Sequence, residues 1–198
     1  MTTTFFLIRH AAHDNVGRYL AGRLEGVRLG EAGQAQALHL ARHMAREPLA
    51  AILSSPRERT LETAKPIAVA CNIEQISICK ELDEIDFGAW SGKTFEELNG
   101  DASWQLWNDQ RQNARTPSGE TMLDVQRRIM RLMDALRDDG QGQSIALVSH
   151  ADVIKAAVCG ILGLQLGDCF RFDIAPASVT TLVHGDWGSK LICLNQVA

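Results

Sequence analysis

Short apolar runs alternate with segments of helical periodicity along most of this 198-residue chain. Four apolar runs predict buried strands, at Thr4 to Ile8, Ala50 to Leu53, Ile76 to Cys79 and Ser144 to Val148. Four segments with apolar side chains every three to four positions predict helices, at Glu31 to Arg46, Pro56 to Ala70, Glu120 to Asp138 and Ala151 to Leu162. The third helix is expected to stop at Gly140. This alternation predicts an α/β fold with a mostly parallel central sheet and helices on both faces.

The remaining segments depart from this pattern. The tail alternates apolar and polar residues, which predicts strands closing one edge of the sheet, at Phe170 to Ile174, Ser178 to Val183 and Lys190 to Leu194. Between the third strand and the long helix, Thr94 opens a capping box, and Trp104 and Trp107 are spaced as packing anchors of a second short helix. We therefore expect a single domain over 1–198, with a helical insertion at about 94–117 over the C-terminal edge of the sheet.

Composition narrows the class of protein. With 20 Lys+Arg against 24 Asp+Glu, the formal net charge is −4, which argues against nucleic-acid binding through bulk positive charge. The 5 cysteines form no C-x-x-C pair, which favours free thiols in a reducing compartment. No uninterrupted apolar stretch is long enough for a membrane span, and the apolar start is too short for a signal peptide. We expect a cytoplasmic protein without a membrane partner, and the oligomeric state stays open.

Groups suited to an anionic ligand follow the predicted strands. Arg9 and His10 end the first strand, Arg59 follows the second, Glu84 follows the third, and His150 ends the fourth. In an open α/β sheet, ligands bind beyond the carboxyl ends of the strands, so we expect these side chains to converge. The guanidinium fork matches phosphate oxygens, whereas the sequence has neither a P-loop nor a dinucleotide-binding glycine motif. A phosphate ester is therefore the natural ligand, without a nucleotide cofactor.

Four motifs give the chain a resemblance to a known family. Leu7-Ile8-Arg9-His10-Ala11 resembles an apolar strand followed by Arg-His-Gly, and residues 54–64 match Ser-Ser-Pro-x-x-Arg-x-x-x-Thr-Ala at every fixed position. Residues 82–92 are similar to Leu-x-Glu-x-x-Phe-Gly-x-Trp-x-Gly, and Val148-Ser149-His150 is similar to an apolar strand ending in Ser-His. Together, these motifs resemble those of the histidine phosphatase superfamily, the phosphoglycerate-mutase-like group. Residues 117–120 resemble the Pro-Gly-Gly-Glu stretch of its phosphatase branch.

The resemblance implies roles for individual residues. His10 would attack the phosphorus and become a phosphohistidine, and Glu84 would protonate the leaving oxygen, with Asp83 and Asp86 as rivals for that role. The groups that would hold the phosphoryl oxygens are Arg9, Arg59 and His150. The residues expected to contact the rest of the substrate are Asn15, Arg18 and Arg23. The implied enzyme is a metal-independent phosphatase without a cofactor, acting on a small phosphorylated metabolite.

Alternatives remain open at this stage. Ala11 stands where the family has glycine, which favours a phosphoester-binding protein without turnover if the backbone there needs a conformation open only to glycine. A phosphoglycerate-type mutase would use the same chemistry, but the chain is shorter than is usual for such mutases, which favours a hydrolase. Spacing disfavours a metal site at His10, His13, Asp14 and His150. Arg57 is predicted to lie on the surface.

Overall fold

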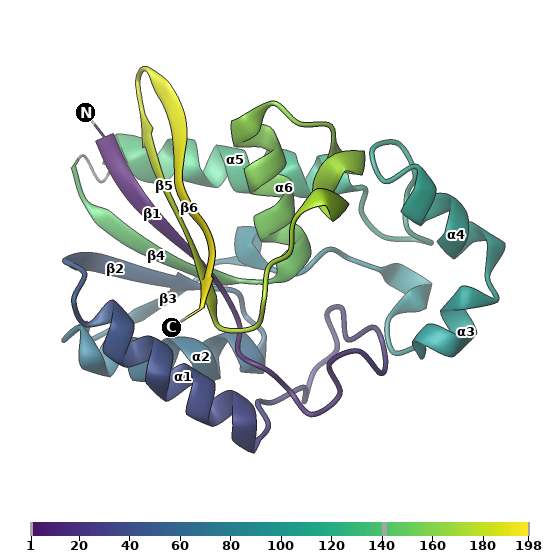
Figure 1. Ribbon diagram of the computed structural model, residues 1–198, viewed down its shortest axis with the longest axis horizontal. Helices are drawn as coiled ribbons and strands as arrows, with labels where there is room; N and C mark the ends of the chain where they lie inside the picture. The colour runs from purple at the N-terminus through teal and green to yellow at the C-terminus, as the bar shows by residue number, and fades with distance from the viewer. Residues whose placement is uncertain (1, 140–141, 198) are drawn as a thin grey trace.

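A six-stranded sheet forms the centre of the molecule, with the strand order β3-β2-β4-β1-β5-β6 (Figure 1). The computed structural model describes residues 2–139 and 142–197, so the expected helix stop at Gly140 lies outside the described residues. The strands are β1 (Thr2–Arg9), β2 (Leu49–Ser54), β3 (Ile76–Ile78), β4 (Ser144–Ser149), β5 (Ser178–Gly185) and β6 (Gly188–Val197). The first four strands pair in parallel, whereas β5 runs antiparallel to β1 and to β6. The predicted mostly parallel sheet is confirmed.

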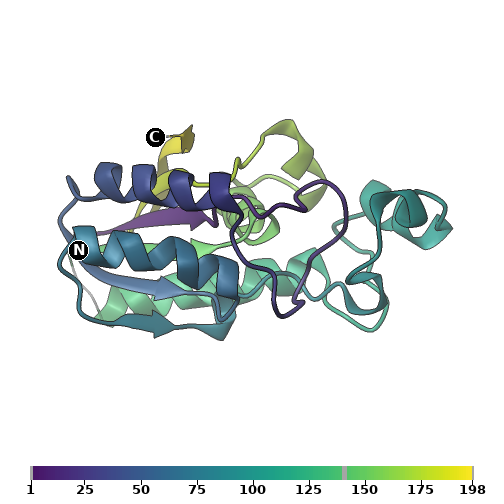
Figure 2. The same ribbon diagram turned by 90° about the horizontal axis from the view of Figure 1, so that it is seen from below.

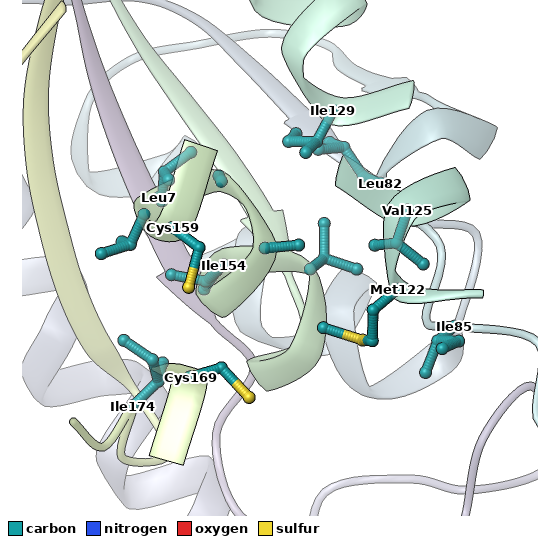
Figure 3. Packing of buried hydrophobic residues seen from close by; sticks show 14 of the residues in the cluster. Leu7, Leu82, Ile85, Met122, Val125, Ile129, Ile154, Cys159, Cys169 and Ile174 are labelled. Carbon is teal, nitrogen blue, oxygen red and sulfur yellow. The ribbon is translucent and has the colours of Figure 1, made fainter. Parts of the chain in front are cut away.

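Helices cover both faces of the sheet. On one face lie α1 (Glu31–Met44) and α2 (Glu58–Ala70), and on the other lie α5 (Met122–Asp139) and α6 (Ala151–Leu162) (Figure 1). Successive side chains of a strand point to opposite faces, so Phe6 and Ile8 of β1 join the core under α1 and α2. Leu7 joins the other core, the cluster that also contains Ile129 and Ile154 (Figure 3). Burial on both faces explains why the central parallel strands β1 and β4 read as continuous apolar runs.

Two short helices, α3 (Phe95–Asn99) and α4 (Ala102–Asp109), occupy the segment between η2 (Gly88–Trp90) and α5. The expected capping box is confirmed, because Thr94 Oγ1 accepts from the Glu97 amide and the Glu97 carboxylate accepts from the Thr94 amide. Trp104 and Trp107 are buried packing anchors, with ring centroids 5.3 Å apart. In Figure 2, both helices lie on the side to which the arrows of β1, β2 and β3 point.

The strand expected at Phe170 to Ile174 is wrong. Residues 166–171 form a 3₁₀ helix, Leu166–Arg171, and the next residues are irregular. Phe170 stacks on the Arg111 guanidinium, whose central carbon lies 4.4 Å from the ring centroid, and Phe172 lies 5.9 Å from the Lys155 ammonium. Phe170 and Phe172 thus lie against cations rather than join the sheet, whereas Ile174 is buried in the core without forming a strand.

Two further expectations concern membranes and thiols. None of the helices that the structure describes is both long and apolar enough to cross a membrane. All five cysteines are free: Cys71, Cys79, Cys159, Cys169 and Cys193.

Candidate active site

A cavity of about 150 Å³ gathers the residues that follow the parallel strands. Four predicted catalytic residues line it: Arg9, His10, Arg59 and Glu84. The fifth, His150, is fully buried, and its ring centroid lies 5.3 Å from that of His10. The structure therefore brings all five side chains together, although they come from four separate segments of the chain.

Strand ends and helix starts fix these positions. The parallel pairing of β1 with β4 sets Arg9 beside Ser149, and the His10 amide donates to the Ser149 carbonyl over 3.0 Å. His10 and His150 therefore leave neighbouring strands at the same level of the sheet. Since α6 begins directly after His150 and Arg59 lies in the first turn of α2, helix starts hold these two side chains.

The ring of His10 is held in one tautomer. Its Nδ1 lies 2.8 Å from the Ala11 carbonyl oxygen, and because that oxygen can only accept, Nδ1 carries the hydrogen. The other nitrogen, Nε2, keeps its lone pair. Burial, followed by the charges of Arg59 and Arg9, holds the pKa of His10 well below its usual range. The imidazole is therefore neutral, as a nucleophile must be.

Several guanidinium hydrogens in this site have no acceptor. Arg9 donates from Nη1 to the Ile174 carbonyl, and Arg59 donates from Nη2 to the Gly22 carbonyl over 2.7 Å. Within the described chain, Arg9 Nε and both Arg59 Nε and Nη1 are buried without a hydrogen-bond partner. Buried donors are nearly always satisfied in proteins, so these atoms indicate a ligand rich in acceptor oxygens.

His150 links Arg59, through Ser55, to the carboxylate of Asp83. Its Nδ1 accepts from Arg59 Nη2 over 3.1 Å, so its Nε2 carries the hydrogen and donates to Ser55 Oγ over 2.8 Å. Ser55 Oγ in turn donates to Asp83 Oδ1 over 3.2 Å. Burial, followed by the charges of Arg59 and His10, holds the pKa of His150 well below its usual range. Both histidines are therefore neutral in the unliganded site.

Glu84 is the carboxyl group in position to exchange a proton. It is 8% exposed, and its Oε2 lies 3.9 Å from His150 Nδ1. Burial, followed by the charge of Asp152, raises the pKa of Glu84 to about 8. Its rival Asp83 is instead engaged by Arg57, whose Nε lies 3.0 Å from Asp83 Oδ1. Arg57 is only 18% exposed at its side chain because of this ion pair, so its expected surface position is wrong.

The residues expected to contact the rest of the substrate do not line the cavity. Arg23 donates to the Glu84 carbonyl over 2.7 Å and to Glu120 Oε2 over 2.8 Å. Its guanidinium also lies 3.6 Å from Asp83 and 3.6 Å from Asp86. Through these contacts Arg23 stabilises the segment that carries Glu84, and Glu120 is its main partner. Asn15 and Arg18 belong to the loop after His10, and Arg18 is exposed.

The third motif keeps its glycine for a steric reason. Gly88 has a φ of +53°, and a Cβ at this position would lie 1.7 Å from the Pro117 carbonyl oxygen. The neighbouring Ala89 amide donates to the same carbonyl over 3.0 Å. Because a side chain is excluded here, the loop that carries Glu84 can pack against the segment that precedes α5.

Ala11 adopts a backbone conformation open to any residue, since its φ is not positive. Its methyl group is fully buried, and its amide donates to Thr63 Oγ1 over 3.0 Å. The site geometry therefore does not need glycine at this position.

Sequence reasoning missed much of the cavity wall. The additional side chains that line it include His13, Tyr19, Phe87, Phe95 and Asp152. Burial, followed by the charges of Arg59 and Arg9, lowers the pKa of His13 to about 4. Asp152 lies two residues after His150 on a helix, and that spacing was the one signal that could have singled it out.

The fold is that of an α/β protein whose cavity gathers two histidines, two arginines and a carboxyl group that is protonated at neutral pH. The family model of the histidine phosphatase superfamily (branch 1) matches residues 5–197. The chain belongs to this superfamily.

Individual members are similar over nearly the whole chain. Phosphoserine phosphatase 1 of Hydrogenobacter thermophilus is 34% identical over 193 residues, which covers 96% of this chain and 90% of that protein. The solved structure of Bacillus stearothermophilus YhfR has a TM-score of 0.90 at 26% identity and covers 99% of this chain and 98% of its own. Phosphoserine phosphatase from Entamoeba histolytica, in complex with 3-phosphoglyceric acid, has a TM-score of 0.87 at 26% identity, with coverage of 98% and 97%.

Proposed function

We propose that this protein is a phosphatase that hydrolyses a small phosphomonoester through a phosphohistidine at His10. The observation that carries the proposal is the pairing of a neutral His10, with Nε2 free, with buried guanidinium donors that lack acceptors. A phosphoryl group supplies the missing acceptor oxygens and places its phosphorus next to a nucleophile.

The first half of the reaction transfers the phosphoryl group to the protein. Arg9 and Arg59 donate to the phosphoryl oxygens, and His150 donates from Nδ1 when the bound anion favours its protonated form. His10 Nε2 forms a bond to phosphorus while the ester P–O bond breaks. Glu84 gives its proton to the departing alkoxide. A raised pKa suits this role, because the carboxyl group must carry a proton at neutral pH.

The second half returns the site to its starting state. The Glu84 carboxylate takes a proton from a water molecule, whose oxygen attacks phosphorus while the bond to His10 Nε2 breaks. Inorganic phosphate leaves, and Glu84 is protonated again. The guanidinium groups neutralise the charge that spreads over the equatorial oxygens, so the residues named here account for the chemistry without a metal ion.

The size of the cavity and the similar proteins support a small substrate. A volume of about 150 Å³ suits a phosphate ester of a short alcohol rather than a nucleotide or a phosphoprotein segment. Similarity to proteins named phosphoserine phosphatase supports a small phosphorylated metabolite.

Hydrolysis of p-nitrophenyl phosphate tests the proposal. We expect His10→Ala to lower kcat/KM by at least about a thousandfold, since covalent catalysis is lost. His39→Ala is the matched control, because His39 is an exposed histidine on α1. We also expect vanadate to inhibit competitively and EDTA to have no effect. Activity of the His10 variant within tenfold of the wild type would remove His10 as the nucleophile.

A further inference from the structure

The cavity lining other than the phosphoryl-binding groups has its own charge pattern. Its wall carries the Asp152 carboxylate and the aromatic rings of Tyr19, Phe87 and Phe95. Apart from Arg9 and Arg59, no lysine or arginine of the described chain lines it. A second anionic group on a substrate would find no cationic partner there, whereas a cation would meet a carboxylate and ring faces.

Asp152 is held so that one carboxylate oxygen is free for a ligand. Arg111 Nη1 donates to Asp152 Oδ1 over 2.8 Å, and no residue that the structure describes donates to Oδ2. Arg111 itself is 8% exposed and packed between two rings, with its central carbon 4.0 Å from the Trp107 centroid and 4.4 Å from that of Phe170. Because Arg111 does not line the cavity, a bound molecule contacts the carboxylate and not the guanidinium.

The position of Asp152 also puts it near the reacting atoms. Asp152 lines the same cavity as Arg9 and Glu84, and its charge raises the pKa of both groups. A substrate whose phosphoryl group is bound by Arg9 and Arg59 therefore has this carboxylate in the wall of the same cavity of about 150 Å³.

We propose that Asp152 binds an ammonium group of the substrate, so that the enzyme selects phosphate monoesters of short amino alcohols over esters with a hydroxyl group in the same place. This proposal rests on the proposed phosphatase function and adds the class of alcohol. The ammonium donates to the free Oδ2, while Arg111 keeps the side chain of Asp152 in place.

O-phosphoethanolamine and 2-hydroxyethyl phosphate form a matched pair of substrates, because they differ in one group and are achiral. The quantity to measure is kcat/KM for O-phosphoethanolamine divided by kcat/KM for 2-hydroxyethyl phosphate. This ratio is compared between each variant and the wild type, so that the difference in leaving groups cancels. Asp152→Asn keeps an oxygen for Arg111 and removes the charge. Asp168→Asn is the control, since Asp168 pairs with Arg171 and does not line the cavity.

We expect Asp152→Asn to lower the ratio at least about tenfold, the usual scale for a charge-assisted hydrogen bond, and Asp168→Asn to leave it within twofold. If the wild type hydrolyses p-nitrophenyl phosphate, an unchanged ratio in Asp152→Asn would overturn the role of Asp152 and leave the phosphatase proposal standing. Absence of that hydrolysis in the wild type would instead overturn the phosphatase proposal.

A second measurement needs no variant. 3-Aminopropylphosphonate and 3-hydroxypropylphosphonate are unreactive analogues of the two substrates, and both should inhibit the wild type competitively. We expect the amino compound to have an inhibition constant at least about tenfold lower. Equal inhibition constants would overturn the proposal.

Discussion

His10 depends on its two neighbouring arginines in two ways. Their charges add to burial in lowering the pKa of the imidazole, which keeps the nucleophile uncharged. The same guanidinium groups carry the buried donors that a phosphoryl group would satisfy. Activation of the nucleophile and binding of the substrate therefore come from one arrangement of charge.

The opposite pKa shifts of His10 and Glu84 predict the pH dependence of the reaction. His10 must be neutral, and its pKa lies well below 6.5, so protonation of His10 lowers activity only in that acid range. Glu84 must be protonated, and its pKa is about 8, so kcat/KM for an alkyl phosphate should fall as the pH rises through about 8. A pH–rate profile measures both limbs.

Two comparisons check the assignment of the alkaline limb. Glu84→Gln should remove it, because the amide does not titrate. The limb should also be weaker for p-nitrophenyl phosphate, whose leaving group departs without a proton. A limb that persists unchanged in Glu84→Gln would assign the proton donor to another group.

Ala11 makes a separate prediction at the residue scale. Because its backbone is ordinary and its methyl group is buried, Ala11→Gly should leave kcat/KM within a few-fold while lowering the free energy of unfolding by about 1–2 kcal/mol. Urea unfolding and p-nitrophenyl phosphate hydrolysis measure the two effects. A gain in activity of a hundredfold would instead identify Ala11 as an inactivating residue.

At the scale of elements, the spacing of apolar residues along the chain predicted most of the fold. The central parallel strands β1 and β4 were predictable because their side chains are buried on both faces of the sheet, and the helices because their apolar side chains recur at helical spacing. The segment 170–174 was not, since Phe170 packs on Arg111 and Phe172 lies near Lys155, both distant in sequence, while Ile174 joins the core without a strand. Periodicity does not distinguish a ring that faces a core from a ring that covers a cation.

Arg111 joins α4 to α6, and its removal tests how strongly these elements are held together. Arg111→Ala should lower the free energy of unfolding by about 2–4 kcal/mol, because it leaves the largely buried Asp152 without its partner and removes a stacked side chain. Arg115→Ala is the control, since the exposed Arg115 to Asp124 pair should contribute less than about 1 kcal/mol. Equal effects in urea unfolding would show that Arg111 is not a structural link.

At the scale of the whole molecule, the site forms because parallel strands end at one side of the sheet. This rule was enough to predict that Arg9, His10 and His150 meet. It did not predict which remaining cations face the cavity, and Arg23 turns instead to Glu120 and the carboxylates around it. Which cations face the cavity depends on how the surrounding loops pack against one another. Neither residue spacing nor hydrophobic periodicity records that packing.

The charge of the cavity also bears on the choice between hydrolase and mutase. A mutase must hold phosphoglycerate while the phosphoryl group returns to it, and no third lysine or arginine in the described ranges lines the cavity to bind its carboxylate. Incubation with 3-phosphoglycerate should therefore release inorganic phosphate, or leave the compound unchanged. Phosphorus NMR distinguishes these outcomes from isomerisation, which would contradict the hydrolase assignment.

Direct detection of the covalent intermediate tests the central claim. Glu84→Gln should react with p-nitrophenyl phosphate, whose leaving group needs no acid, and then release the phosphoryl group slowly because no base activates water. After a quench into alkali, mass spectrometry should locate one phosphoryl group per chain on His10, stable to base and labile to acid. A phosphoryl group on another residue, or none on this variant while the wild type turns over, would contradict the account.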